Sequence, residues 1–144
     1  MRFSERLTPS PWTFAACGLL IPAGLLVFLP VSVPVAIGAA VLFFAGAVAA
    51  LVLLSPVIEV GAGELRAGRA RVPIAVIGGT AGFRGEEATA ERGVRLDARA
   101  FLCIRGWVDP VVRIELADPA DPTPYWIVST RRPDELIAAI EADR

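Results

Sequence analysis

The stretch from residue 7 to residue 58 contains no charged residue. Within it, two long apolar runs occupy residues 12–29 and 34–54. A helix of roughly 20 apolar residues crosses a bilayer core about 30 Å thick, and both runs fall in the range of suitable lengths. A charge at the centre of a span would oppose insertion by roughly 2.5 to 3.5 kcal/mol. Because neither run contains a charge, the sequence predicts two membrane-spanning helices.

The two runs are separated by Pro30, Ser32 and Pro34. Proline disrupts the interior of a helix but suits a break or the first turn. We therefore expect a tight extracytoplasmic turn at residues 30–33 and an antiparallel helical hairpin. Pro22 lies inside the first run, where we expect a kink because proline lacks the backbone N–H.

The distribution of arginine predicts the orientation of the hairpin. Cytoplasmic segments near a span carry an excess of basic residues, and the turn between the two spans has none. Residues 1–11 and residues 56–144 are therefore predicted to be cytoplasmic, in a multi-pass protein of the inner (plasma) membrane. The arginines that flank the spans are Arg2, Arg6, Arg66, Arg69 and Arg71.

Small residues are frequent in the second span. Gly46 and Ala50 have the four-residue spacing that lets two membrane helices approach closely. This spacing is consistent with a dimerisation face and thus with a homo-oligomer. Packing inside the hairpin, or simply an alanine-rich composition, accounts for the same spacing and is the favoured interpretation.

Residues 56–144 have the pattern of a β-rich domain, because short apolar segments alternate with turn residues. Pro133 and the acidic residues that follow it suit the start of one C-terminal helix. The sequence thus predicts an α+β membrane protein: a transmembrane α-hairpin, then a small β-barrel-like domain, closed or partly open, of the pleckstrin-homology-like type. The expected strands are residues 56–60, 64–67, 70–77, 80–84, 100–105, 111–117 and 125–129.

Three segments carry a family resemblance: residues 4–9 (SERLTP), 63–70 (GELRAGRA) and 121–136 (DPTPYWIVSTRRPDEL). Together they resemble an uncharacterised actinobacterial family, a domain of unknown function. Its members are small membrane proteins with two N-terminal helices and a pleckstrin-homology-like tail. The resemblance implies this architecture and assigns no activity.

The composition offers little for catalysis. The chain has no histidine, so an imidazole base or ligand is excluded, and its two cysteines are Cys17 and Cys103. We expect no catalytic, cofactor or metal site, and therefore no enzyme. The net charge of −1 argues against a nucleic-acid partner, which a strongly basic face would indicate.

Arginines and aromatic residues are the candidate contact residues. Arginines near a membrane attract anionic headgroups, although they also serve generally for orientation and as solvated charge. Tyr125 and Trp126 are adjacent in a predicted strand and must point to opposite faces. Either one is exposed for a partner or both pack in the core. The candidate arginines are Arg66, Arg69, Arg71, Arg131 and Arg132.

These observations predict a non-catalytic adaptor or accessory protein that binds a protein partner at the lipid bilayer. A sensor of anionic lipid headgroups is the alternative. A membrane-bound enzyme is a further, less favoured alternative.

Overall fold

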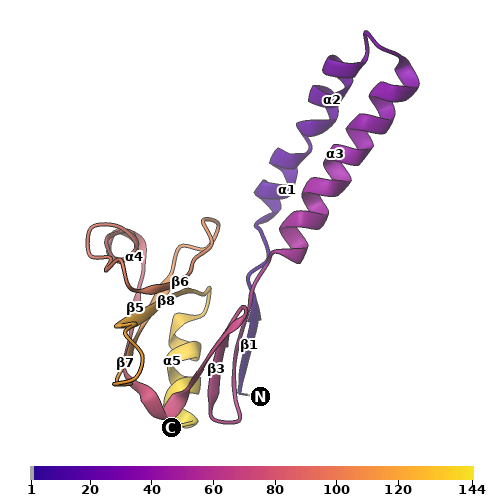
Figure 1. The fold of residues 1–144 in the computed structure, drawn as a ribbon. Coiled ribbons are helices and arrows are strands. Elements are labelled where there is room, and N and C mark those ends of the chain that lie inside the picture. Colours follow the sequence, from indigo (N-terminus) through magenta and orange to yellow (C-terminus); the bar gives the residue numbers. More distant parts are fainter. Residues whose placement is uncertain (1) are drawn as a thin grey trace. The chain divides into compact units, whose positions relative to one another are not determined.

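The computed structural model describes residues 2–144 and divides the chain into two compact units (Figure 1). One unit is Thr8–Ser55, the helical hairpin. The other combines residues 2–7 with Pro56–Arg144 and is the β-rich domain. The N-terminal segment therefore belongs to the domain, although the whole hairpin separates the two in sequence.

The helical hairpin consists of α1 (Pro11–Cys17), α2 (Leu20–Phe28) and α3 (Val33–Leu53). The first apolar run is divided between α1 and α2 because Pro22 has no N–H to donate to the carbonyl of Gly18, four residues earlier. Ile21 N–H donates to that carbonyl instead, at 3.2 Å. The predicted kink is thus observed as a break one turn before Pro22. By length and composition, Pro11–Phe28 and Val33–Leu53 are each able to cross a membrane.

The helices α2 and α3 approach each other closely at Gly24. A Cβ added there would lie 3.0 Å from Ala40 Cα, and Ala40 is buried. Gly46 has open space where a Cβ would be, and Ala50 is exposed. Packing inside the hairpin therefore rests on Gly24 and not on Gly46, whereas an interface between two copies at Gly46 stays a prediction.

The first sheet is antiparallel and has the order β1-β2-β3-β4. Arg6 of β1 pairs with Val57 of β2, so the two neighbouring strands flank the helical hairpin in sequence. Pro73 ends the last strand at the sheet edge, where its missing N–H breaks no ladder bond. The strands are β1 (Phe3–Arg6), β2 (Val57–Gly61), β3 (Glu64–Ala67) and β4 (Ala70–Pro73).

The second sheet has the order β5-β7-β8-β6, and β6 runs parallel to β8. A 3₁₀ turn, η1 (Ile74–Val76), leads from the first sheet to the second, so the prediction of one strand over residues 70–77 is wrong. In residues 2–144 no strand ladder joins the two sheets, so of the two predicted forms of the barrel the closed one is wrong. The strands are β5 (Ile77–Phe83), β6 (Phe101–Cys103), β7 (Val111–Leu116) and β8 (Tyr125–Ser129).

Two helices complete the domain: α4 (Gly85–Arg92) and α5 (Pro133–Ala142). The main core contains inner-face residues of both sheets and the apolar side of α5, where Leu136 and Ile140 are fully buried. A smaller core lies on the other face of the second sheet and includes Ala88 of α4. The second sheet is therefore covered on both faces, and burial of all five β8 residues agrees with this.

Candidate functional site

Two of the candidate arginines lie together on the outer face of the first sheet. Arg66 of β3 pairs in register with Arg71 of β4, and with Glu59 of β2 on its other side. All three side chains face away from the core because their neighbours, such as Leu65 and Val72, face into it. Arg66 Nη1 lies 3.4 Å from Glu59 Oε2, and Arg66 Nε donates to the Gly68 carbonyl at 3.1 Å.

A shallow pocket of about 280 Å³ lies on this outer face. Glu59 neutralises Arg66, whereas Arg71 forms no hydrogen bond or ion pair with a described residue. The pocket thus carries both signs of charge on its lining, which suits a charged surface of a partner. Its lining residues are Glu59, Val60, Gly61, Ala62, Glu64, Arg66 and Arg71.

Arg69 lies in the turn between β3 and β4. Gly68, with φ of +62°, forms this turn, in a left-handed conformation that glycine adopts without strain. Arg69 is exposed and, within the described residues, forms no ion pair. The β3–β4 hairpin therefore carries Arg66, Arg69 and Arg71 on one short segment.

Arg131 and Arg132 precede α5 and have different roles. Arg132 donates to the Ser4 carbonyl at 2.8 Å and to Glu135 at 3.0 Å, and its guanidinium lies 4.7 Å from the centre of the Phe3 ring. It therefore connects the start of α5 to β1. The side chain of Arg131 is exposed, and its backbone N–H is used in the same connection.

Glu5 is the centre of that connection and was not predicted from the sequence. Its side chain is in the interior, with the residue only 8% exposed. The carboxylate accepts a hydrogen bond from the Thr130 hydroxyl and another, at 3.1 Å, from Arg131 N–H. The sequence did contain one signal that could have placed Glu5 in the interior. Residues two apart in a strand share a face, so Glu5 lies on the same face as the apolar residues Phe3 and Leu7.

Tyr125 and Trp126 point to opposite faces of the second sheet, and both are buried. Tyr125 belongs to the smaller core and Trp126 to the main core, where its ring lies 4.5 Å from that of Phe101. The structure therefore confirms the alternative in which both aromatic residues pack in the core, and not the one in which one of them is exposed. Neither residue presents an exposed aromatic surface to a partner.

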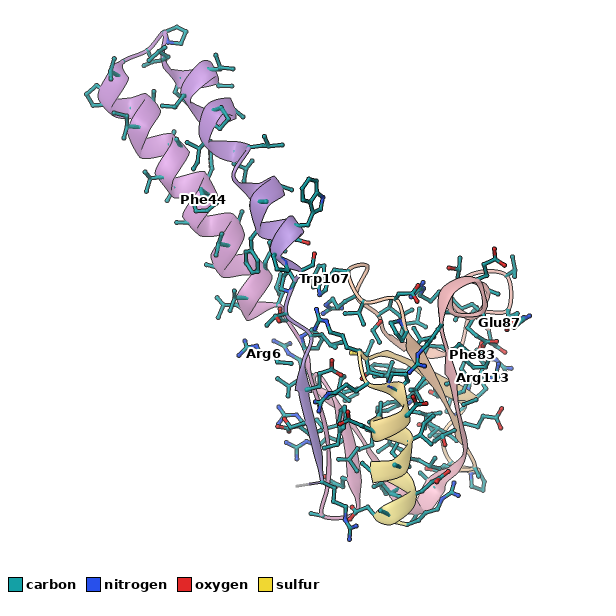
Figure 2. The ribbon with its side chains drawn as sticks, turned by 180° about the vertical axis from the view of Figure 1, so that it is seen from behind. Arg6, Phe44, Phe83, Glu87, Trp107 and Arg113 are labelled. Atoms are coloured by element: carbon teal, nitrogen blue, oxygen red, sulfur yellow. The ribbon has the colours of Figure 1, made fainter. Side chains whose placement is uncertain are left out.

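A charged network beside Tyr125 connects α4 to the second sheet, and Figure 2 labels two of its members, Arg113 and Glu87. The Arg113 guanidinium lies 3.9 Å from the centre of the Tyr125 ring and donates to Glu91 at 3.3 Å. Arg95 also donates to Glu91, at 3.3 Å, so two arginines neutralise this buried carboxylate. The Tyr125 hydroxyl accepts from Asp97 N–H at 2.7 Å. Residues 86–92 are polar and in sequence suit either a short helix or a loop, and the long-range pairs of this segment could not be inferred from that pattern.

Residues 2–140 match a family described as a protein of unknown function, DUF3093. The chain belongs to the DUF3093 family. The searches of curated proteins and of solved structures gave no match.

In the DUF3093 chain, two aspartates of the loop before β8 have structural roles. Asp118 and Asp121 each accept a hydrogen bond from the backbone N–H two residues later, at 2.9 Å. Hydrogen bonds from Thr123 hold the pKa of Asp121 below its usual value. No group of three metal-ligating side chains occurs among residues 2–144. Cys103 is buried, and burial raises the pKa of its thiol.

Proposed function

We propose that the DUF3093 chain is a two-span protein of the inner membrane with both termini in the cytoplasm, and that its β-rich domain is a non-catalytic adaptor for a protein partner. The observation that carries this proposal is the pairing of β1 with β2 on either side of the hairpin. Antiparallel neighbours place the two ends of the hairpin at the same end of one sheet. This supports a shared side of the membrane for both termini.

The same pairing connects the domain to the helices through two covalent links. A doubly linked domain is held close to the bilayer and keeps fewer orientations than a domain on one flexible linker. This arrangement suits a module that presents a surface to another membrane-associated protein. The C-terminal helix, packed against the sheets in the main core, supports a distant pleckstrin-homology-like origin, which we retain as a proposal.

The outer face of the first sheet is the partner surface in this proposal. It offers the pocket beside Arg66 and Arg71, with Glu59 and Glu64 on its rim. Alternating charges of this kind favour selectivity, because a partner must match both signs. Tyr125 and Trp126 are not part of the proposed surface because they are buried.

The test is photocrosslinking from native membranes. A photoreactive residue is placed at Arg71, and the control places it at Asp118, which lies in a loop outside the pocket. We expect the Arg71 probe to give a discrete crosslinked protein that the Asp118 probe does not give. The same crosslinked protein should also form when the photoreactive residue stands at position 64. We expect the R66E/R71E substitutions to abolish that product. The absence of any product specific to the pocket would refute the adaptor function.

A further inference from the structure

The strand β5 forms one edge of the second sheet, because β7 is its one neighbour in the described strand order. Leu116 of β7 donates its N–H to the Pro124 carbonyl at 3.1 Å, so its backbone groups are turned toward β8. Backbone groups of successive residues in an antiparallel strand point alternately to its two sides. Arg113 therefore turns its N–H and C=O toward Ala81, its register partner in β5.

The outward-facing backbone groups of β5 follow from this register. Thr80 and Gly82 flank the paired residue, so they turn their N–H and C=O groups away from the sheet. These four groups form no hydrogen bond with residues 2–144, and Gly82 is exposed. The bulge between Ile77 and Gly79 and the hydrogen bond from Arg144 to the Ile77 carbonyl both lie before residue 80. The open part of the edge is therefore residues 80–82.

The other three sheet edges in residues 2–144 carry features that oppose the addition of a strand. The strand β4 contains Arg71 and ends at Pro73, and β6 is three residues long. The strand β1 is joined to the start of α5 by Arg132, which donates to the Ser4 carbonyl at 2.8 Å. By contrast, β5 has seven residues and contains neither a charge nor a proline. Among the described strands, β5 thus has the edge most open to a further strand.

A small pocket of about 150 Å³ lies beside this edge on the outer face of the second sheet. It is lined by Gly79 and Ala81, which have no side chain or a small one, and by Arg113 and Glu115 of β7. Arg113 Nε is buried and has no hydrogen-bond partner in the described chain, although Glu115 Oε1 lies 3.5 Å from it. A buried donor without an acceptor is unfavourable, so this pocket suits an incoming acceptor.

The charges around Arg113 restrict the chemistry of that acceptor. Its guanidinium already has two carboxylates, because Nη1 lies 3.3 Å from Glu91 Oε2 and Nε lies 3.5 Å from Glu115 Oε1. A third carboxylate would be repelled by both of them. The oxygen of a neutral amide accepts the Nε hydrogen without that repulsion. The pocket therefore favours the side chain of glutamine or asparagine.

The opposite face of the open edge borders α5. A Cβ built at Gly82 would lie 3.4 Å from Ile137 Cδ1 and 3.5 Å from Pro133 Cβ, which are both apolar. Alternate side chains of a strand point to opposite faces of its sheet. A strand added at β5 would place one set of side chains beside these two residues and the other set beside the pocket. Apolar residues suit the first set, and an amide side chain suits the second.

We propose that β5 binds an extended segment of a partner protein as a fifth strand of the second sheet, and that apolar residues alternate with glutamine or asparagine in this segment. Main-chain hydrogen bonds to Thr80 and Gly82 supply affinity, and the pocket beside Arg113 supplies selectivity. A second copy of β5 is a poorer occupant, because its sequence IGGTAGF has no amide side chain. The site lies on a different sheet from the adaptor surface around Arg71, so it goes beyond the proposed function and is independent of it.

The test selects heptapeptides from a random phage-displayed library on the full chain in detergent micelles. We expect enrichment of peptides in which glutamine or asparagine alternates with valine, isoleucine or leucine. Binding of the enriched peptide should slow amide hydrogen exchange at Thr80 and Gly82, which nuclear magnetic resonance measures residue by residue. Exchange at Gly79 and Ala81 should not change, because these amides already face β7.

Two pairs of variants separate the edge from the pocket. Gly82→Pro removes the outward N–H and no ladder bond, whereas Gly82→Ala keeps that N–H. We expect Gly82→Pro to weaken peptide binding about tenfold, as the loss of one hydrogen bond does, and Gly82→Ala to change it less than about twofold. Ala81→Leu fills the pocket and should abolish the preference for an amide residue, and Ala81→Ser should keep it. If Gly82→Pro unfolds the domain, amide exchange of the wild-type chain still decides the question.

Three outcomes would overturn the added strand. These are equal peptide binding by the wild-type chain and Gly82→Pro, protection of amides other than Thr80 and Gly82, and a selection in which no peptide is enriched over empty micelles. A chain that is dimeric as wild type and monomeric as Gly82→Pro, by light scattering, would identify a second copy as the occupant and overturn the partner assignment. Failure of the Arg71 probe would refute the adaptor surface and leave this inference intact.

Discussion

At the scale of single residues, the most consequential side chain is Glu5. A buried carboxylate is stable only when donors satisfy it, and here the Thr130 hydroxyl and Arg131 N–H do so. Because these donors come from the far end of the chain, Glu5 connects the N-terminal strand to the start of α5. Sequence alternation places it on the inner face, but only the fold supplies its partners.

Replacing Glu5 tests this connection. Glu5→Ala leaves two donors without an acceptor, so the free energy of unfolding should fall by about 1 to 3 kcal/mol. The control, Glu64→Ala, removes an acid from the exposed face of the same sheet and should change it by less than about 0.5 kcal/mol. Denaturant unfolding of the detergent-solubilised chain, followed by tryptophan fluorescence, measures both. In a double-mutant cycle, Thr130→Val should be strongly non-additive with Glu5→Ala, and full additivity would argue against the bond.

Cys103 allows a test of burial by chemistry. The thiolate is the nucleophile, and burial raises the pKa of this thiol, so the folded domain should hold it protonated well above neutral pH. In a Cys17→Ser background, maleimide should modify Cys103 slowly at pH 8 and rapidly once denaturant unfolds the domain. Rapid modification of the folded protein would show that β6 opens or is misplaced.

At the scale of elements, the contact between α2 and α3 depends on the absence of a side chain at Gly24. A methyl group there meets the backbone of α3 at 3.0 Å, and backbone cannot rotate away as a flexible side chain can. The small residues of the second span were visible in the sequence. Which of them faces α2 depends on the rotation of each helix, and the sequence spacing of Gly46 and Ala50 did not reveal it.

Gly24→Ala should therefore weaken the hairpin by about 1 to 3 kcal/mol, as overpacking of a close contact does. Gly38→Ala is the matched control, because its Cβ would meet nothing within 4 Å. That variant should be neutral or more stable by up to about 1 kcal/mol, from the higher helix propensity of alanine. Loss of helical circular dichroism during titration with a denaturing detergent measures the two variants. Equal behaviour would mean that the two helices do not pack at Gly24.

At the scale of the whole molecule, the hairpin is an insertion between two paired strands. β1 cannot pair with β2 until both helices have been made, because the helices lie between the two strands in sequence. Folding of the domain is thus linked to the topology of the hairpin, through the Leu7–Pro56 hydrogen bond and the β1–β2 ladder.

This arrangement predicts a water-soluble form of the domain. Replacing Thr8–Ser55 with Asn-Gly would join β1 to β2 by a tight turn, since this dipeptide suits a two-residue hairpin loop. The joined form should unfold cooperatively as a monomer. A fragment of residues 56–144 alone should be less stable by several kcal/mol or aggregate, because Ile58, Val60 and the β2 edge lose their cover. Thermal unfolding and light scattering compare the two, and equal stability would show that β1 is dispensable.

The local pattern of the sequence was enough to determine the two apolar helices, most of the strands and the C-terminal helix. Hydrophobic length, proline positions and alternation are properties of neighbouring residues, and they predict such elements directly. The tertiary structure alone decided the separation into two open sheets, the parallel pairing of β6 with β8, and the burial of both Tyr125 and Trp126. It also placed residues 2–7 inside the domain and gave Glu5, Glu91 and Arg132 their partners. These features depend on contacts between residues far apart in sequence, and a single sequence carries no record of which distant strands and side chains meet.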